Sequence, residues 1–134
     1  ITRPNGAWNA PLSDLARWMG FLSGRSHGDT SLARTYAVIL PHDDLLEMWR
    51  PRYDIAAPAE FPQKMGESFF IYPRGADTLV GHTGEQAGFR SFMFIDPRTG
   101  AGVVGVFNTR NDAEPDKSAL SFSAIVEQAL GLVK

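Results

Sequence analysis

The sequence contains no cysteine among its 134 residues. This absence excludes disulfide bonds, zinc sites built on thiolates, and thiol nucleophiles. The histidines are few as well, and His27, His42 and His82 do not recur at the short spacing that places two metal ligands on one helix face. We therefore predict no metal site and no other cofactor.

The sequence also lacks an excess of charge of either sign, with a formal net charge of −2. Nucleic acids and anionic membranes bind basic surfaces, so neither is an expected partner. No apolar run approaches the roughly 18 residues that a membrane-spanning helix needs. The first residues, Ile1–Gly6, combine neither the basic start nor the apolar core of a signal peptide.

What is present is ordinary for one globular domain: 43% hydrophobic and 21% charged residues. The first part has helical periodicity. One helix is expected to follow Asn9 as its N-cap and to stop near Gly24. A second is expected to start at Asp29 and end before Pro41, and a third covers about Asp43 to Arg50.

The second part changes to short β-branched and aromatic runs. After a proline-rich connecting loop at 51–66, about four strands are expected at 67–72, 78–82, 89–95 and 102–108. Their short connections favour antiparallel hairpins. A last helix, with Val126 and Leu130 on its apolar face, packs on one face of the sheet and leaves the other uncovered. The fold class is α+β, with a helical segment and connecting loop at 1–60 and an antiparallel sheet with its C-terminal helix at 61–134.

The triplet His82-Thr83-Gly84 follows an apolar strand and precedes a glycine-spaced turn. A glycine at a strand end lets a ligand approach the backbone closely. Adjacent side chains of a strand point to opposite faces, so His82 and Thr83 can serve one ligand only at a bulge or an edge. The N–H of Glu85 could then donate to a developing oxyanion. On its own, the triplet is more typical of a surface turn.

The triplet and its neighbours resemble the third signature motif of the serine β-lactamase, penicillin-binding and esterase family. Other parts of the chain are similar to that family in the same order. The segments that carry the resemblance are Asn9–Trp18, Leu45–Pro51, Gly81–Phe89, Phe92–Pro97 and Gly102–Thr109.

The resemblance implies a role for each residue of the motif. His82 stands where the family has Lys or His to shape the electrostatics of the site and contact a substrate carboxylate. Thr83 would hydrogen-bond that carboxylate, Gly84 would leave room for the substrate, and Glu85 would supply one oxyanion-hole N–H from its backbone. With histidine in place of lysine at this position, the motif is more similar to those of the esterase, D-aminopeptidase and class-C-like branches of the family than to those of dedicated β-lactamases. The substrate would be a small-molecule ester, amide or β-lactam, and a periplasmic or secreted location is slightly favoured.

Two motifs of the family are missing. None of the serines is followed by Lys three residues later, so Ser-x-x-Lys is absent. Tyr-x-Asn is absent too, because Val38, Ile55 and Arg74 stand two residues after the tyrosines. We therefore expect the C-terminal part of such an enzyme, inactive without its N-terminal segment and able to form homo-oligomers. The alternative is a non-catalytic, hydrolase-like module that binds a ligand or a partner protein.

Overall fold

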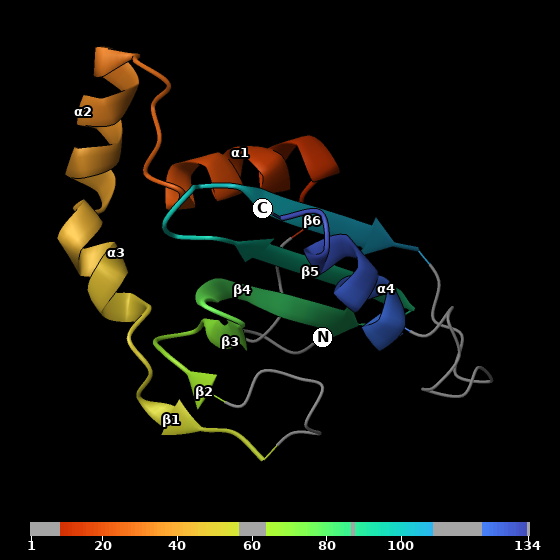
Figure 1. Ribbon diagram of the computed structural model, residues 1–134. Coiled ribbons are helices and arrows are strands. Elements are labelled where there is room, and N and C mark those ends of the chain that lie inside the picture. The colour runs from red at the N-terminus through yellow and green to blue at the C-terminus, as the bar shows by residue number, and fades with distance from the viewer. Residues whose placement is uncertain (1–8, 57–63, 87, 109–121, 134) are drawn as a thin grey trace.

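The computed structural model describes residues 9–56, 64–86, 88–108 and 122–133 (Figure 1). Helices come first, strands follow, and a helix closes the chain. The elements are α1 (Leu12–Leu22), α2 (Thr30–Ile39), α3 (His42–Met48), β1 (Tyr53–Asp54), β2 (Lys64–Met65), β3 (Phe70–Arg74), β4 (Asp77–Gln86), β5 (Phe89–Ile95), β6 (Gly102–Phe107) and α4 (Phe122–Leu130).

The strands form one six-stranded sheet in the order β1-β2-β3-β4-β5-β6. Every neighbouring pair is antiparallel, so each strand lies beside the one that follows it in the chain. This arrangement confirms the predicted α+β class and the predicted hairpins. The division into segments 1–60 and 61–134 stays a prediction.

The helix ends match the predictions in part. Asp29 is the N-cap of α2, where its carboxylate accepts hydrogen bonds from the N–H groups of Ser31 and Leu32. Helix α1 begins later than predicted: its N-cap is Pro11, which is extended at ψ 159°, so Asn9 lies outside the helix. Helix α3 ends at Met48, and the predicted last residue, Arg50, lies beyond it.

Three predictions for the strands were wrong. The segment predicted as a loop contains β1 and β2, each of two residues, which is too short to show a periodicity. The sheet therefore has six strands rather than about four. The third error concerns β4, which does not stop at His82 but continues through Gly84 to Gln86.

Apolar side chains on both faces of the sheet form two clusters. Val80 and Ile95 belong to the first cluster, whereas their neighbours Leu79 and Phe94 belong to the second. Because successive strand residues point to opposite faces, the two clusters lie on opposite sides of the sheet. The strands of the sheet are therefore apolar on both faces.

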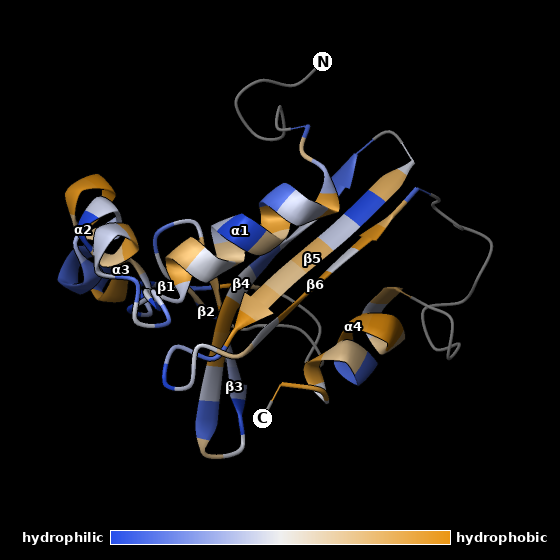
Figure 2. Cartoon of the chain, turned by 90° about the horizontal axis from the view of Figure 1, so that it is seen from above, coloured by the Kyte–Doolittle hydropathy of each residue, from blue (hydrophilic) through white to orange (hydrophobic). Residues whose placement is uncertain are grey.

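Helices cover both clusters, contrary to the expectation of an uncovered face. Leu22 at the end of α1 and Leu45 of α3 are buried in the first cluster, and Val126 and Leu130 of α4 in the second. Helices α1 and α4 accordingly lie on opposite sides of the sheet, and hydrophobic colour covers much of β5 between them (Figure 2). The core of the molecule is therefore built from helices and strands together.

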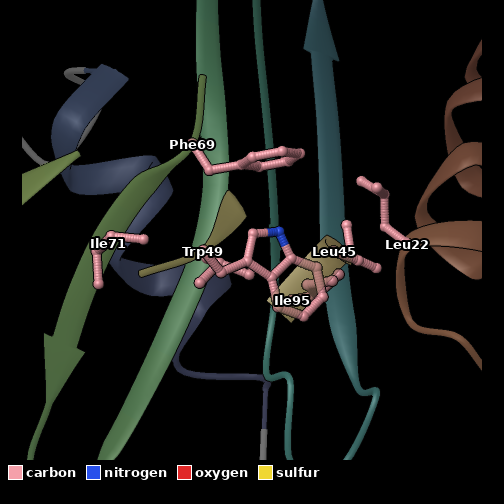
Figure 3. Packing of buried hydrophobic residues seen from close by; sticks show 7 residues of the cluster. Leu22, Leu45, Trp49, Phe69, Ile71 and Ile95 are labelled. Carbon is pink, nitrogen blue, oxygen red and sulfur yellow. The ribbon is translucent and has the colours of Figure 1, made fainter. Parts of the chain in front are cut away.

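Trp49 anchors the end of α3 to the sheet. Its side chain is 6% exposed and meets the ring of Phe69 edge to face, with the ring centroids 6.2 Å apart. The indole nitrogen has no hydrogen-bond partner among the described residues, and in Figure 3 it points toward Phe69.

Two polar contacts hold the sheet and its last helix. After β5, the buried carboxylate of Asp96 accepts hydrogen bonds from the backbone N–H of Arg98 at 2.7 Å and from the hydroxyl of Thr99 at 2.8 Å. On the face that carries the second cluster, the Tyr72 hydroxyl of β3 donates a hydrogen bond to Glu127 of α4. The first contact closes the β5–β6 turn, and the second ties α4 to the sheet.

Both contacts change a pKa. Burial raises the pKa of Asp96, but the hydrogen bonds from Thr99 and Arg98 and the Arg98 guanidinium outweigh it, so this pKa lies below its ordinary value. Burial, followed by the hydrogen bond to Glu127 and the charge of that carboxylate, raises the pKa of Tyr72 to about 12. Asp96 is therefore held ionised and Tyr72 is held protonated.

Candidate functional site

Strand β4 has two parts with different neighbours. Its pairing with β3 runs from Asp77 to Gly81, which we call the inner segment. Its pairing with β5 continues as far as Gln86. The remaining part, His82–Gln86, which we call the open segment, therefore has a strand on one side only among the described residues (Figure 1).

The junction between the two segments is closely packed. A Cβ added to Gly81 would lie 1.9 Å from the Met93 carbonyl oxygen and 2.7 Å from Cδ1 of Phe94. No side chain fits in that space, so glycine is required for β4 and β5 to approach as they do. Gly81 is buried, whereas His82 directly after it is exposed.

His82 stands at the start of the open segment. Its imidazole stacks on the ring of Phe70, with centroids 4.6 Å apart and planes 7° from parallel. Phe70 is the first residue of β3, so the imidazole lies against the beginning of that strand. Neither nitrogen of the imidazole has a hydrogen bond or ion pair within the described part of the chain, which leaves both available to a ligand.

Thr83 and His82 point to opposite faces of the sheet. The register with β5 is one to one from Val80 to Gln86, without a bulge, and it places His82 opposite Met93 and Thr83 opposite Phe92. Met93 packs against the first cluster and Phe92 belongs to the second. Because β3 does not extend this far, a ligand lying along that side of the strand can still reach both side chains.

Gly84 leaves an opening above its neighbour on β5. It is paired with Ser91, and among the described residues the only atom within 4 Å of an added Cβ would be the Ser91 hydroxyl oxygen, at 2.8 Å. This hydroxyl has no hydrogen-bond partner among the described residues. The space over Gly84 is thus bounded by a hydroxyl and not by backbone, unlike the space at Gly81.

The side chain of Glu85 is turned toward β5. Its carboxylate forms an ion pair with the Arg90 guanidinium at 3.0 Å, and the guanidinium carbon lies 5.3 Å from the centre of the Phe122 ring. These contacts fix the side chain on the face that carries α4. The backbone of Glu85 nevertheless belongs to the open segment, beyond the pairing with β3.

The acidic residues of α3 and the tryptophans near the helices have structural positions. Asp43 and Asp44 occupy the first turn of α3, and Trp49 is buried. Trp18 is 37% exposed and stacks on Phe21. Within the described ranges, no three His, Asp or Glu side chains come together to hold a metal, and no helix has the length and apolar character to cross a membrane. Trp8 and residues 109–117 lie outside the described residues.

The family model named Beta-lactamase matches residues 2–128 of this chain. The chain belongs to the beta-lactamase family. Searches of the curated proteins and of the solved structures found no match. Membership of the beta-lactamase family relates the chain to hydrolases and indicates a small-molecule substrate.

The match covers both the helices and the sheet, as the ordered resemblance in the sequence implied. The sequence pattern did not indicate that Ser91 lies beside the His-Thr-Gly motif. In the sequence, Ser91 is only one of the serines that do not begin a Ser-x-x-Lys motif. The signal that could have found it is the strand register across the hairpin. That register depends on the conformation of a turn in which Gly88 has φ +85°, and the sequence provides no direct measure of it.

Proposed function

We propose that this chain of the beta-lactamase family supplies one wall of a serine-hydrolase site that cleaves an ester, amide or β-lactam. The observation that carries the proposal is the open segment of β4, where the His-Thr-Gly motif lies on a part of the strand that β3 does not cover. A substrate lying along this side of the strand would continue the sheet beyond β3. Backbone hydrogen bonds would then hold it in one orientation.

Each residue of the motif has a distinct part in this proposal. His82 and Thr83 contact the substrate carboxylate, and Gly84 leaves space for the acyl group. The backbone N–H of Glu85 donates to the oxyanion that develops when the carbonyl is attacked. Such donors act strongly because they are already oriented before the reaction begins.

The nucleophile is supplied by polypeptide outside these 134 residues. An active serine needs a neighbouring base, and no serine of this chain is followed by lysine in the Ser-x-x-Lys arrangement. By itself the chain binds a substrate but forms no acyl-enzyme. The same absence favours the second candidate, a non-catalytic module that binds a ligand at the open segment.

The test is covalent labelling by a fluorescent penicillin together with hydrolysis of a chromogenic ester. The chain alone is expected to give neither. Addition of an N-terminal piece that carries Ser-x-x-Lys, taken from the same reading frame, is expected to give both. The His82→Ala variant should reduce labelling in the reconstituted protein, and Ser31→Ala, an exposed change on α2, should not.

The two candidates differ in their outcomes. Reconstituted chains that bind penicillin reversibly but are never labelled favour the non-catalytic module. Labelling of the chain alone contradicts both candidates, because it requires a nucleophile within these residues.

A further inference from the structure

We propose that Ser91 of β5 is an additional ligand-binding residue, whose hydroxyl donates a hydrogen bond to a ligand carboxylate held over Gly84. The inference rests on the proposed function, since it extends the same site. It adds to the His-Thr-Gly segment a group from the neighbouring strand, which the hairpin register brings beside the motif.

The first argument is access. Gly84 and Ser91 are directly opposite in the register, and Gly84 has no side chain to cover its partner. An added Cβ would lie 2.8 Å from the Ser91 hydroxyl oxygen and within 4 Å of no other atom in the part of the chain that the structure describes. The glycine therefore opens a path from the open segment of β4 to a hydroxyl on β5.

The second argument is the missing partner. The side chain of Ser91 is half-buried, and its hydroxyl has no hydrogen bond within the described ranges. This hydroxyl is not one of the buried polar atoms without a partner, so it is accessible to solvent, and a ligand can bind it without first breaking an internal hydrogen bond. The hydroxyl of Ser23, by comparison, donates to the Gly20 carbonyl at 2.7 Å. A ligand group over Gly84 would satisfy the donor of Ser91.

The third argument identifies the ligand as a carboxylate. Ser91 lies diagonally across the strand pair from His82, on the same face of the sheet. Diagonal neighbours are about 7 Å apart, a gap that one carboxylate can bridge with a hydrogen bond at each end. The carboxylate of Glu85 would repel an anion, but it lies on the other face and is paired with Arg90.

The experiment uses the whole 134-residue chain, labelled with ¹⁵N, and two probes. Benzylpenicillin carries the carboxylate, and its methyl ester is the matched uncharged probe. Binding is read from the amide shifts of the open segment. Ser91→Ala is expected to weaken benzylpenicillin binding about tenfold, because it removes a hydrogen bond to a charged group. The same change should leave the binding of the methyl ester within about twofold.

Two variants separate a ligand contact from an effect on folding. Ser91→Thr keeps the hydroxyl on a β-branched residue that suits a strand, so it should bind like the natural chain. Gly84→Ala fills the opening and should weaken both probes. Unchanged amide spectra away from the site show that each variant is folded.

The outcomes distinguish this inference from the proposed function. If benzylpenicillin shifts the open segment, and His82→Ala weakens it but Ser91→Ala does not, the role of Ser91 is overturned and the proposed function stands. Equal losses of both probes in Ser91→Ala also overturn the carboxylate contact. If neither probe shifts the open segment of the natural chain, the proposed function fails and the inference fails with it.

Discussion

The inner and open segments belong to one ten-residue strand, yet they differ in strand pairing and in the burial of the residues on either side of their junction. Leu79, Val80 and Gly81 in the inner segment are buried between β3 and β5. In the open segment, His82 and Glu85 are exposed and pairing continues on one side only within the described ranges. The difference arises because the pairing with β3 stops at Gly81, whereas the pairing with β5 continues to Gln86. Because β3 is shorter than β4, the end of β4 becomes a polar edge that is accessible to a ligand.

A glycine-to-alanine substitution in each segment, which adds one methyl group, is the strongest test of the difference in packing between the two segments. Gly81→Ala should destabilise the fold by about 3 kcal/mol or more, because its Cβ would collide with the Met93 carbonyl, which cannot move without disturbing the sheet. Gly84→Ala should cost only about 1 kcal/mol, since the Ser91 hydroxyl can rotate away. Urea unfolding measures both. Equal losses would mean that the two segments are packed alike.

The stability of the fold around the inner segment is also expected to decrease at acidic pH. Asp96 follows β5 beside this segment, and Asp77 at the start of β4 shares the Arg98 guanidinium with it. Because the folded-state pKa of Asp96 is depressed, its stabilisation is present above the unfolded-state value of about 3.9 and is lost as the pH falls through the folded-state value.

Asp96→Asn should therefore cost about 2 kcal/mol at neutral pH and weaken the dependence of stability on pH below about pH 4. The free energy of unfolding between pH 2 and pH 7 provides the measurement. The matched control is Asp14→Asn, which removes an exposed carboxylate on α1. An identical pH profile for Asp96→Asn and the natural chain would contradict the role given to Asp96.

The smallest expected effect concerns Tyr72, which pairs with Leu79 of the inner segment. Its raised folded-state pKa of about 12 means that its contribution is complete below pH 10 and is lost as the pH rises from 10 to about 12. Tyr72→Phe should cost about 1 kcal/mol at neutral pH and reduce the alkaline loss. Unfolding followed by circular dichroism from pH 8 to pH 12 measures it, and Tyr53→Phe, an exposed change on β1, is the control.

Much of this fold could be predicted from local patterns. The cap at Asp29 and the apolar face of α4 are signals that a few neighbouring residues carry. The segments β1 and β2 could not be predicted, because two residues show no alternation and their pairing joins parts of the chain separated by a long connection. The covering of the first cluster was missed for a similar reason: Leu22 and Leu45 meet the sheet through contacts distant in sequence.

The candidate site divides in the same way. The motif singled out His82, Thr83, Gly84 and Glu85 as candidates only together with the ordered resemblance along the rest of the chain. It could not show that β4 continues past the triplet, since the glycines that follow are typical of a turn. Nor could it show that Phe70 stacks on His82 or that Ser91 lies beneath Gly84, because both depend on where β3 begins and on the register of β5.

The buried indole of Trp49 gives the chain an optical reporter of how α3 docks. Its environment is apolar and its N–H faces a ring, whereas Trp18 is partly exposed to water on α1. Detachment of α3 from the strands would hydrate Trp49 first and move its emission to longer wavelengths. In a background in which Trp8 and Trp18 are both replaced by Phe, Trp49 is the one tryptophan left. Fluorescence could then follow the joining of helix and sheet while circular dichroism follows the backbone, and so reveal whether the two are lost in one step.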